Sequence, residues 1–227
     1  KITFQLIQLL KLIGFQVFDQ QSLLQVNFFN RWKYNPEGHV RMQFGLSVMD
    51  ELREGGQLDF DYDRDQGTMN AYGINIHSRK YRGFGKLGIL FPDKPYQSIG
   101  FQASATYYQQ DGLFGTDNYS GDQTAIYTNL IFQSIIGNTN HMYSLGGSFQ
   151  YDRYEEMLNL DDFRRTEYVP GLFAQYTFTS PQKFNGIAGL RLDYNSLYGM
   201  LVTPRLHMRY MLDEHTSLRA SAGRGYR

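Results

Sequence analysis

The segment QSIGFQASATY, residues 97–107, alternates between apolar and polar side chains from Ser98 onwards. A period of two places successive side chains on opposite faces of an extended chain. The segment is therefore predicted to be a β-strand with one apolar face and one polar face. The apolar face consists of Ile99, Phe101, Ala103, Ala105 and Tyr107.

The same alternation returns along most of the chain, for example over 40–48, 143–151 and 202–212. It predicts an all-β chain of about eleven antiparallel, up-and-down strands. The apolar residues of the first of these strands do not alternate. The expected ranges are 2–16, 24–34, 39–50, 74–91, 97–109, 123–136, 141–153, 166–179, 185–195, 202–212 and 217–227.

The connections between these strands are expected to alternate between two classes. Short connections contain Pro, Gly, Asn or Asp at the bend, as tight turns require. Long connections are rich in Asp, Gly, Tyr and Asn. In an up-and-down meander every second connection lies at the same end, so one end should have tight turns and the other long polar loops. The short set is 35–38, 92–95, 137–140, 180–184 and 213–216, and the long set is 51–73, 110–122, 154–165 and 196–201.

Alternating strands joined by short turns at one end and long loops at the other predict part of an antiparallel transmembrane β-barrel. The alternative interpretation is a soluble β-sandwich. Aromatic side chains, 16% of the chain, gather near the apolar strand ends, as interfacial girdles require. The apolar set that includes Phe101, Leu206, Met208 and Tyr210 is expected to face lipid. The polar face should line a wet lumen, and its expected lumen-facing cations are Lys86, Arg191, Arg205 and Arg209.

Composition argues against several other classes of protein. Lysine and arginine (22) balance aspartate and glutamate (22), so net charge gives no support for a nucleic-acid partner. No run of about 18 apolar residues could cross a bilayer as a helix. Nucleophile and phosphate-loop motifs are absent, and the glycines at 83, 85 and 88 fall inside an expected strand. We therefore expect no catalytic residues and no enzyme.

The long connection 51–73 carries carboxylates at every second position: Asp59, Asp61, Asp63 and Asp65. In an extended chain they would share one side and could offer oxygen ligands to calcium, the one cofactor considered. Arg64 stands where an EF-hand needs glycine, so that motif is excluded. The alternative is a solvated acidic loop.

The long connection 110–122 mixes aromatic and polar groups. Phe114, Asn118 and Tyr119 are candidate ligand-binding residues, because aromatic rings give contact area while amides orient a bulky ligand. An ordinary surface loop is the equal alternative.

Several sequence segments resemble the barrel of TonB-dependent outer-membrane receptors, particularly of the Bacteroidetes type. The likeness covers about residues 24–227 and is weaker over 1–22. It rests on Asn30-Arg31-Trp32, KYRGFGKLGILF at 80–91, PDKPYQSIGFQASATYYQQ at 92–110, GNTNHMYSLGGSFQYD at 137–152, TPRLHMRY at 203–210 and SLRASAGRGYR at 217–227.

This resemblance implies a barrel of 22 strands around a plug, of which about eleven central strands would lie here. The plug, the TonB-contacting segment and the other strands would then lie outside residues 1–227. It implies a location in the bacterial outer membrane, with lipid, TonB and a small-molecule substrate as partners. The expected function is energised uptake of a bulky scarce nutrient such as a siderophore, haem or a cobalamin-like molecule. A passive porin or structural barrel is one alternative, and a soluble β-rich binding protein is another.

Overall fold

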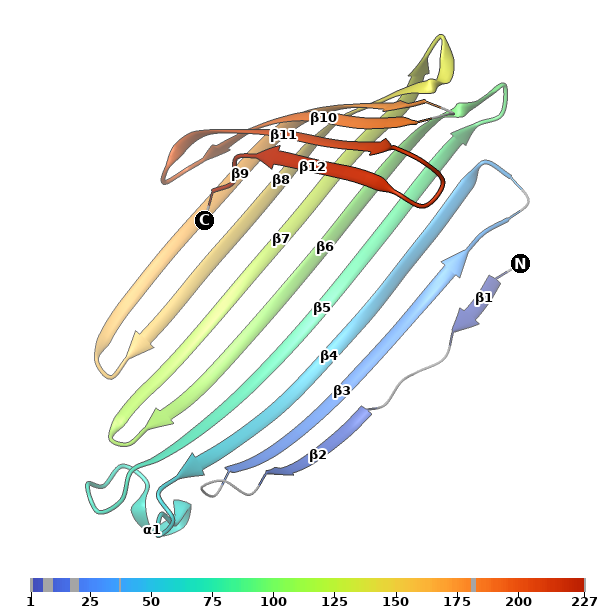
Figure 1. The fold of residues 1–227 in the computed structure, drawn as a ribbon. Coiled ribbons are helices and arrows are strands. Elements are labelled where there is room, and N and C mark those ends of the chain that lie inside the picture. The colour runs from blue at the N-terminus through green and yellow to red at the C-terminus, as the bar shows by residue number, and fades with distance from the viewer. Residues whose placement is uncertain (1, 6–9, 17–20, 37, 181–182, 227) are drawn as a thin grey trace.

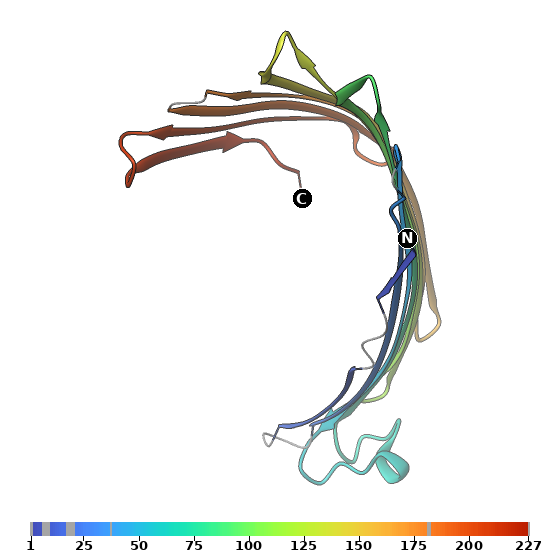
Figure 2. The ribbon, with the colours of Figure 1, turned by 90° about the vertical axis from the view of Figure 1, so that its right-hand side faces the viewer.

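One antiparallel β-sheet, curved into an open trough, makes up almost all of the structure (Figures 1 and 2). This computed structural model describes residues 2–5, 10–16, 21–36, 38–180 and 183–226. No helix among these residues is long and apolar enough to cross a membrane.

The strands follow one another along the sheet in sequence order from β3 to β12. β1 and β2 both pair with β3, so together they occupy the place of the predicted first strand, part of which falls outside the described residues. The strands are β1 Ile2–Gln5, β2 Leu10–Gln16, β3 Gln21–Tyr34, β4 Val40–Gly56, β5 Gly73–Phe91, β6 Lys94–Phe114, β7 Asp117–Ile136, β8 Asn138–Leu158, β9 Asp161–Thr179, β10 Phe184–Asn195, β11 Gly199–Met211 and β12 Ser217–Gly223.

The central strands are about twice as long as a bilayer requires. β5 to β9 contain 19 to 21 residues each, whereas a tilted membrane strand needs about 9–11. The predicted long loops 110–122 and 154–165 are therefore wrong, because both segments continue the strands as ladders.

Two-residue turns close these tall hairpins. Gly115-Thr116 joins β6 to β7, and Asn159-Leu160 joins β8 to β9. Gly115 and Asn159 have φ values of 64° and 55°, and tight hairpin turns need this left-handed conformation, which glycine and asparagine adopt most readily. The predicted loop 196–201 also shrinks, because β11 already begins at Gly199.

The connection between β4 and β5 does contain an irregular segment, shorter than the predicted 51–73. β4 extends to Gly56, and the loop 57–72 includes the single helical turn α1, Tyr62–Asp65. It forms the lobe at the lower end of the sheet in Figure 1.

The two faces of the sheet differ in exposure. In β4 the apolar side chains at alternate positions from Val40 to Val48 are exposed, from 36% at Val40 to 52% at Leu46, while Gln43, Ser47 and Glu51 are half-buried or buried. Side chains on the inside of a curved sheet converge and shield one another, so the polar face is the concave one (Figure 2). The apolar face is convex, and its apolar side chains over 40–48 are exposed.

The sheet does not close on itself. β12 pairs with β11, and β1 and β2 pair with β3 at the other edge, with no ladder between these edges in the described residues. The prediction of a partial, antiparallel, all-β barrel wall is confirmed.

Candidate functional site

The convex face carries an apolar band with a polar boundary at one end. The stacked rings of Tyr81 and Tyr107, 6.4 Å apart, mark this boundary. The Tyr107 hydroxyl donates a hydrogen bond of 2.7 Å to Asp122, which lies beyond the band. Such tyrosines suit the membrane–water interface, because the ring stays apolar while the hydroxyl reaches water.

The band matches the thickness of a bilayer. In β6 it runs from Ile99 to Tyr107, about nine residues, which is close to the length of a membrane strand. Phe101, Leu206, Met208 and Tyr210 belong to this face and are 39–42% exposed, so the predicted division into faces is confirmed for them. Beyond the tyrosines the strands continue with polar groups on both faces.

The concave face at the level of the band is rich in cations. The ladder register places Lys86 opposite Gln102, Arg205 opposite Gly189 and Arg209 opposite Asn185, all on the polar face. The same alternation puts further lysines and arginines there: Arg31, Lys33, Arg41, Arg82 and Arg219. Whether Lys86, Arg191, Arg205 and Arg209 line a lumen remains a prediction.

Arg191 is a concave-face cation with two hydrogen-bond partners. Its Nε donates to Asp193 at 2.6 Å, and its Nη2 donates to the Ser148 hydroxyl at 2.7 Å. Asp193 is the acidic partner of Arg191. Asp152 and Glu167 lie on the same face in the row of Arg82. The cations named on this face still outnumber these three carboxylates, so this part of the concave face would attract carboxylates or other anions.

At the end of the band marked by Tyr107, the concave face has a network of neutral donors around a carboxylate. Asp152 is 7% exposed and accepts hydrogen bonds from Gln150 (2.6 Å) and Gln123 (3.3 Å). Gln123 also donates to the Tyr154 hydroxyl at 3.0 Å. Sequence analysis missed this network, because glutamines and tyrosines on alternate positions look the same as an ordinary solvated strand face.

Tyr119 and Glu156 form a second polar contact on the concave face near the strand ends. The Tyr119 hydroxyl donates to Glu156 at 2.8 Å. Burial, with this hydrogen bond, raises the pKa of Tyr119 to about 12. Tyr119 therefore stays a neutral hydrogen-bond donor at physiological pH.

The three predicted ligand-binding residues are not brought together. Phe114 and Tyr119 share the concave face, whereas Asn118 belongs to the convex face with Leu113, its register partner. The loop that was expected to gather them is a hairpin, and in a strand neighbouring side chains point to opposite faces. Their role in ligand binding stays a prediction.

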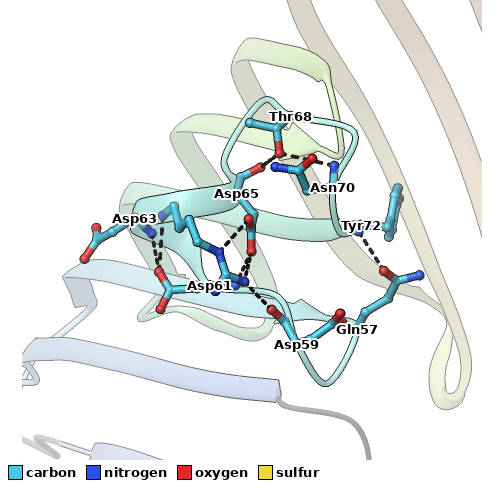
Figure 3. Close-up of polar contacts among 9 residues, drawn as sticks. Gln57, Asp59, Asp61, Asp63, Asp65, Thr68, Asn70 and Tyr72 are labelled. Atoms are coloured by element: carbon cyan, nitrogen blue, oxygen red, sulfur yellow. Dashed lines mark hydrogen bonds and ion pairs between the residues drawn. The ribbon is translucent and has the colours of Figure 1, made fainter.

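The four aspartates predicted to bind calcium do not act as one set. Asp61 caps α1 by accepting from the backbone N–H groups of Asp63 and Arg64, at 3.1 and 3.2 Å (Figure 3). Asp65 is buried, accepts from both Nε and Nη2 of Arg64, and also accepts from the Asp61 N–H. These bonds lower the pKa of Asp65 to about 2.

Helical geometry explains the difference. Alternate residues share a side only in an extended chain, and residues 62–65 form a helical turn. Within the described ranges, no group of three or more His, Cys, Asp or Glu side chains could hold a metal ion. The geometry gives calcium no support here.

Known proteins with the same architecture match this chain in sequence pattern and in structure. Residues 11–227 match the family model described as TonB dependent receptor-like, beta-barrel. The alcaligin outer-membrane receptor FauA of Bordetella pertussis matches with a TM-score of 0.70 at 11% identity, over 88% of this chain and 36% of that one. No curated protein sequence matches the chain.

The receptor FpvA is a second structural match. FpvA of P. aeruginosa bound to heterologous pyoverdines gives a TM-score of 0.65 at 13% identity, over 89% of this chain and 35% of that one. The FpvAI–pyocin S2 complex gives the same score and identity, covering 89% and 34%. The chain thus spans about a third of the length of the solved structures that it matches. The narrower Bacteroidetes type stays a prediction.

Proposed function

Because the chain belongs to the TonB-dependent receptor β-barrel family of the bacterial outer membrane, we propose that it serves energised import of a bulky scarce nutrient. Siderophore-bound iron, haem and cobalamin-like molecules are the proposed substrates. The structural matches support the first of these, since one is an alcaligin receptor and another is bound to pyoverdines. In this proposal TonB is engaged by parts of the receptor outside residues 1–227.

The observation that carries the proposal is the chemical difference between the two faces of one sheet. The convex face meets lipid, and the concave face offers cations at the band level and further hydrogen-bonding groups at one end of the band. A bulky polar substrate could cross beside such a wall without meeting hydrocarbon. The cations Arg205 and Arg209 would pair with carboxylates of a plug or with anionic substrate groups.

An uptake assay with the intact receptor tests the proposal. A strain lacking the receptor gene, and the same strain with the gene restored, would be given labelled iron-loaded siderophores, haem or cobalamin. Only the complemented strain should accumulate one of them, and a protonophore should stop the uptake. Uptake that continues with the protonophore would instead indicate a passive porin.

A double charge-reversal variant tests, in the same assay, whether the concave-face cations contribute to uptake. Arg205→Glu with Arg209→Glu should lower uptake severalfold, because the substitutions reverse the charge of two neighbouring cations on the concave face. Arg164→Glu is the matched control, since Arg164 lies on the convex side above the band, paired with Asp162 at 2.8 Å. Equal uptake by both variants would remove the role assigned to the concave cations.

A further inference from the structure

A hollow of about 590 Å³ lies on the convex face, beyond the end of the lipid band. Leu52, His77 and Asp111 are register partners on adjacent strands. Each lies an even number of residues from Val48, Tyr81 or Tyr107 on its own strand, so all three side chains share the lipid-facing side of the sheet. The hollow therefore faces away from the concave surface and away from any path through a barrel.

The loop 57–72 forms one wall of this hollow and is fixed to the convex face. A Cβ atom at Gly73 would lie 2.2–2.3 Å from the Phe60 ring, and one at Gly56 would lie 3.1 Å from the Phe60 Cβ. Gly56 and Gly73 are register partners, so the phenyl ring packs directly on a pair of residues without side chains. Tyr62 and Gln66 of this loop line the hollow.

The neighbouring hairpins are also tied together around the hollow. The Gly115 N–H donates to the Gly73 carbonyl at 2.7 Å, and the Asn118 N–H donates to the Asn159 side chain at 2.9 Å. Asn159 Nδ2 donates to Asp117, also at 2.9 Å. Five consecutive strands thus present one preformed surface, which lowers the entropy lost on binding.

The lining combines apolar side chains with amides and hydrogen-bonded carboxylates. Leu52, Leu113 and Met157 supply apolar contact. Asn75 donates to Glu54 at 3.1 Å, and Asp111 accepts from Arg79 (3.2 Å) and from Ser120 (3.0 Å). No lysine or arginine is among the described residues that line the hollow.

Its height above the membrane follows from the strand geometry. The row of Leu52, His77 and Asp111 lies four residues beyond the row of Val48, Tyr81 and Tyr107. Four residues extend about 13 Å along a strand, or about 10 Å in height at the tilt of such barrels. With the tall strands facing outward, as outer-membrane barrels place their larger connections, a surface at this height would meet the sugars of the outer-leaflet glycolipid.

We propose that this hollow binds a neutral segment of the oligosaccharide of outer-leaflet lipopolysaccharide. Sugars present an apolar C–H face and a rim of hydroxyl groups, and the lining offers both complements, with amide and carboxylate groups able to hold adjacent hydroxyls. The absence of a lysine or arginine from the lining argues for sugar rather than phosphate recognition, because phosphate binding favours such cations.

Binding of the released oligosaccharide to the purified full-length receptor tests this site. The probe is core oligosaccharide from the producing strain, dephosphorylated and freed of lipid. The wild type should bind it, and Tyr62→Ala with Gln66→Ala should weaken binding at least about tenfold, since hydrogen bonds of an amide and a ring contact are lost. Tyr198→Ala with Thr116→Ala is the matched control, because these exposed residues lie outside the lining.

The outcomes separate this site from the proposed transport function. Substrate uptake should be unchanged in the Tyr62 and Gln66 variant, because the hollow faces away from the concave surface. Failure of the wild type to bind the dephosphorylated probe, binding that needs the phosphates, or equal binding by both double variants would each overturn the proposal.

Discussion

Leu206 and His207 are neighbours in β11 whose side chains lie on opposite faces of the sheet. Leu206 is 41% exposed on the convex face, near the middle of the apolar stretch of this strand. Leu206→Arg should impair assembly, because an arginine facing the bilayer midplane costs about 2–4 kcal/mol. His207→Arg should be tolerated, since position 207 already lies on the polar face. Heat-modifiable electrophoretic mobility of the receptor measures assembly, and equal defects would contradict the assigned faces.

Asp65 gives the loop 57–72 a defined acid sensitivity. Its pKa is lowered from 3.8 to about 2, chiefly by hydrogen bonds from Arg64. The ionised form therefore stabilises the loop fully above about pH 4, and this stabilisation is lost as the pH falls towards 2.

A spin label at Met69, which is 94% exposed, reports this transition. Label mobility should stay constant from pH 8 to pH 5 and increase between about pH 4 and pH 2. Asp65→Asn should show the mobile spectrum already at pH 7. Asp63→Asn is the control, because the Asp63 contact in this loop is made by its backbone N–H. A flat profile in the wild type would refute the role given to Asp65.

At the scale of elements, alternation predicted the strands wherever one face meets lipid. It failed for the upper halves of β6 to β9, where Asp111, Asp122 and Glu155 on the convex face meet water like the polar groups opposite them. With water on both faces, no apolar period remains to identify a strand. Gly115 and Asn159 are residues typical of tight turns, but they lie inside the longer loops 110–122 and 154–165 that the sequence predicts.

In the candidate site, too, alternation predicts which face a residue lies on but not which residues it contacts. The cations Lys86, Arg205 and Arg209 could be placed on the polar face from the sequence, because alternation continues around them. The contacts of Asp152 with Gln123 and Gln150 depend on the register between strands. A register is fixed by turn lengths, and those were predicted incorrectly at this end of the sheet.

The attachment of the loop 57–72 depends on the packing of Phe60 against Gly73. Gly73→Ala should displace the ring and loosen the loop, at a local cost of about 1–3 kcal/mol for overpacking. Gly38→Ala is the control, because a Cβ there meets nothing within 4 Å. Protease cleavage within 57–72 should rise in the Gly73 variant only. Adding Phe60→Ala should bring no further increase, whereas additive effects would contradict the packing.

At the scale of the whole molecule, one sheet forms a wall whose two ends differ. The apolar band adjoins the short turns, and the tall polar hairpins project from its other edge. In outer-membrane barrels short turns face the periplasm and the larger connections face outward. Both the proposed uptake and the proposed glycolipid site depend on this orientation.

Cysteine labelling on intact cells tests the orientation most directly, because the chain itself contains no cysteine. Thr116→Cys lies in the turn between β6 and β7, and Asn138→Cys lies at the opposite end of β7, where β8 begins. A membrane-impermeant maleimide should label the receptor at position 116 on intact cells and at position 138 only after the outer membrane is opened. Labelling of position 138 but not 116 on intact cells would invert the wall and contradict the account.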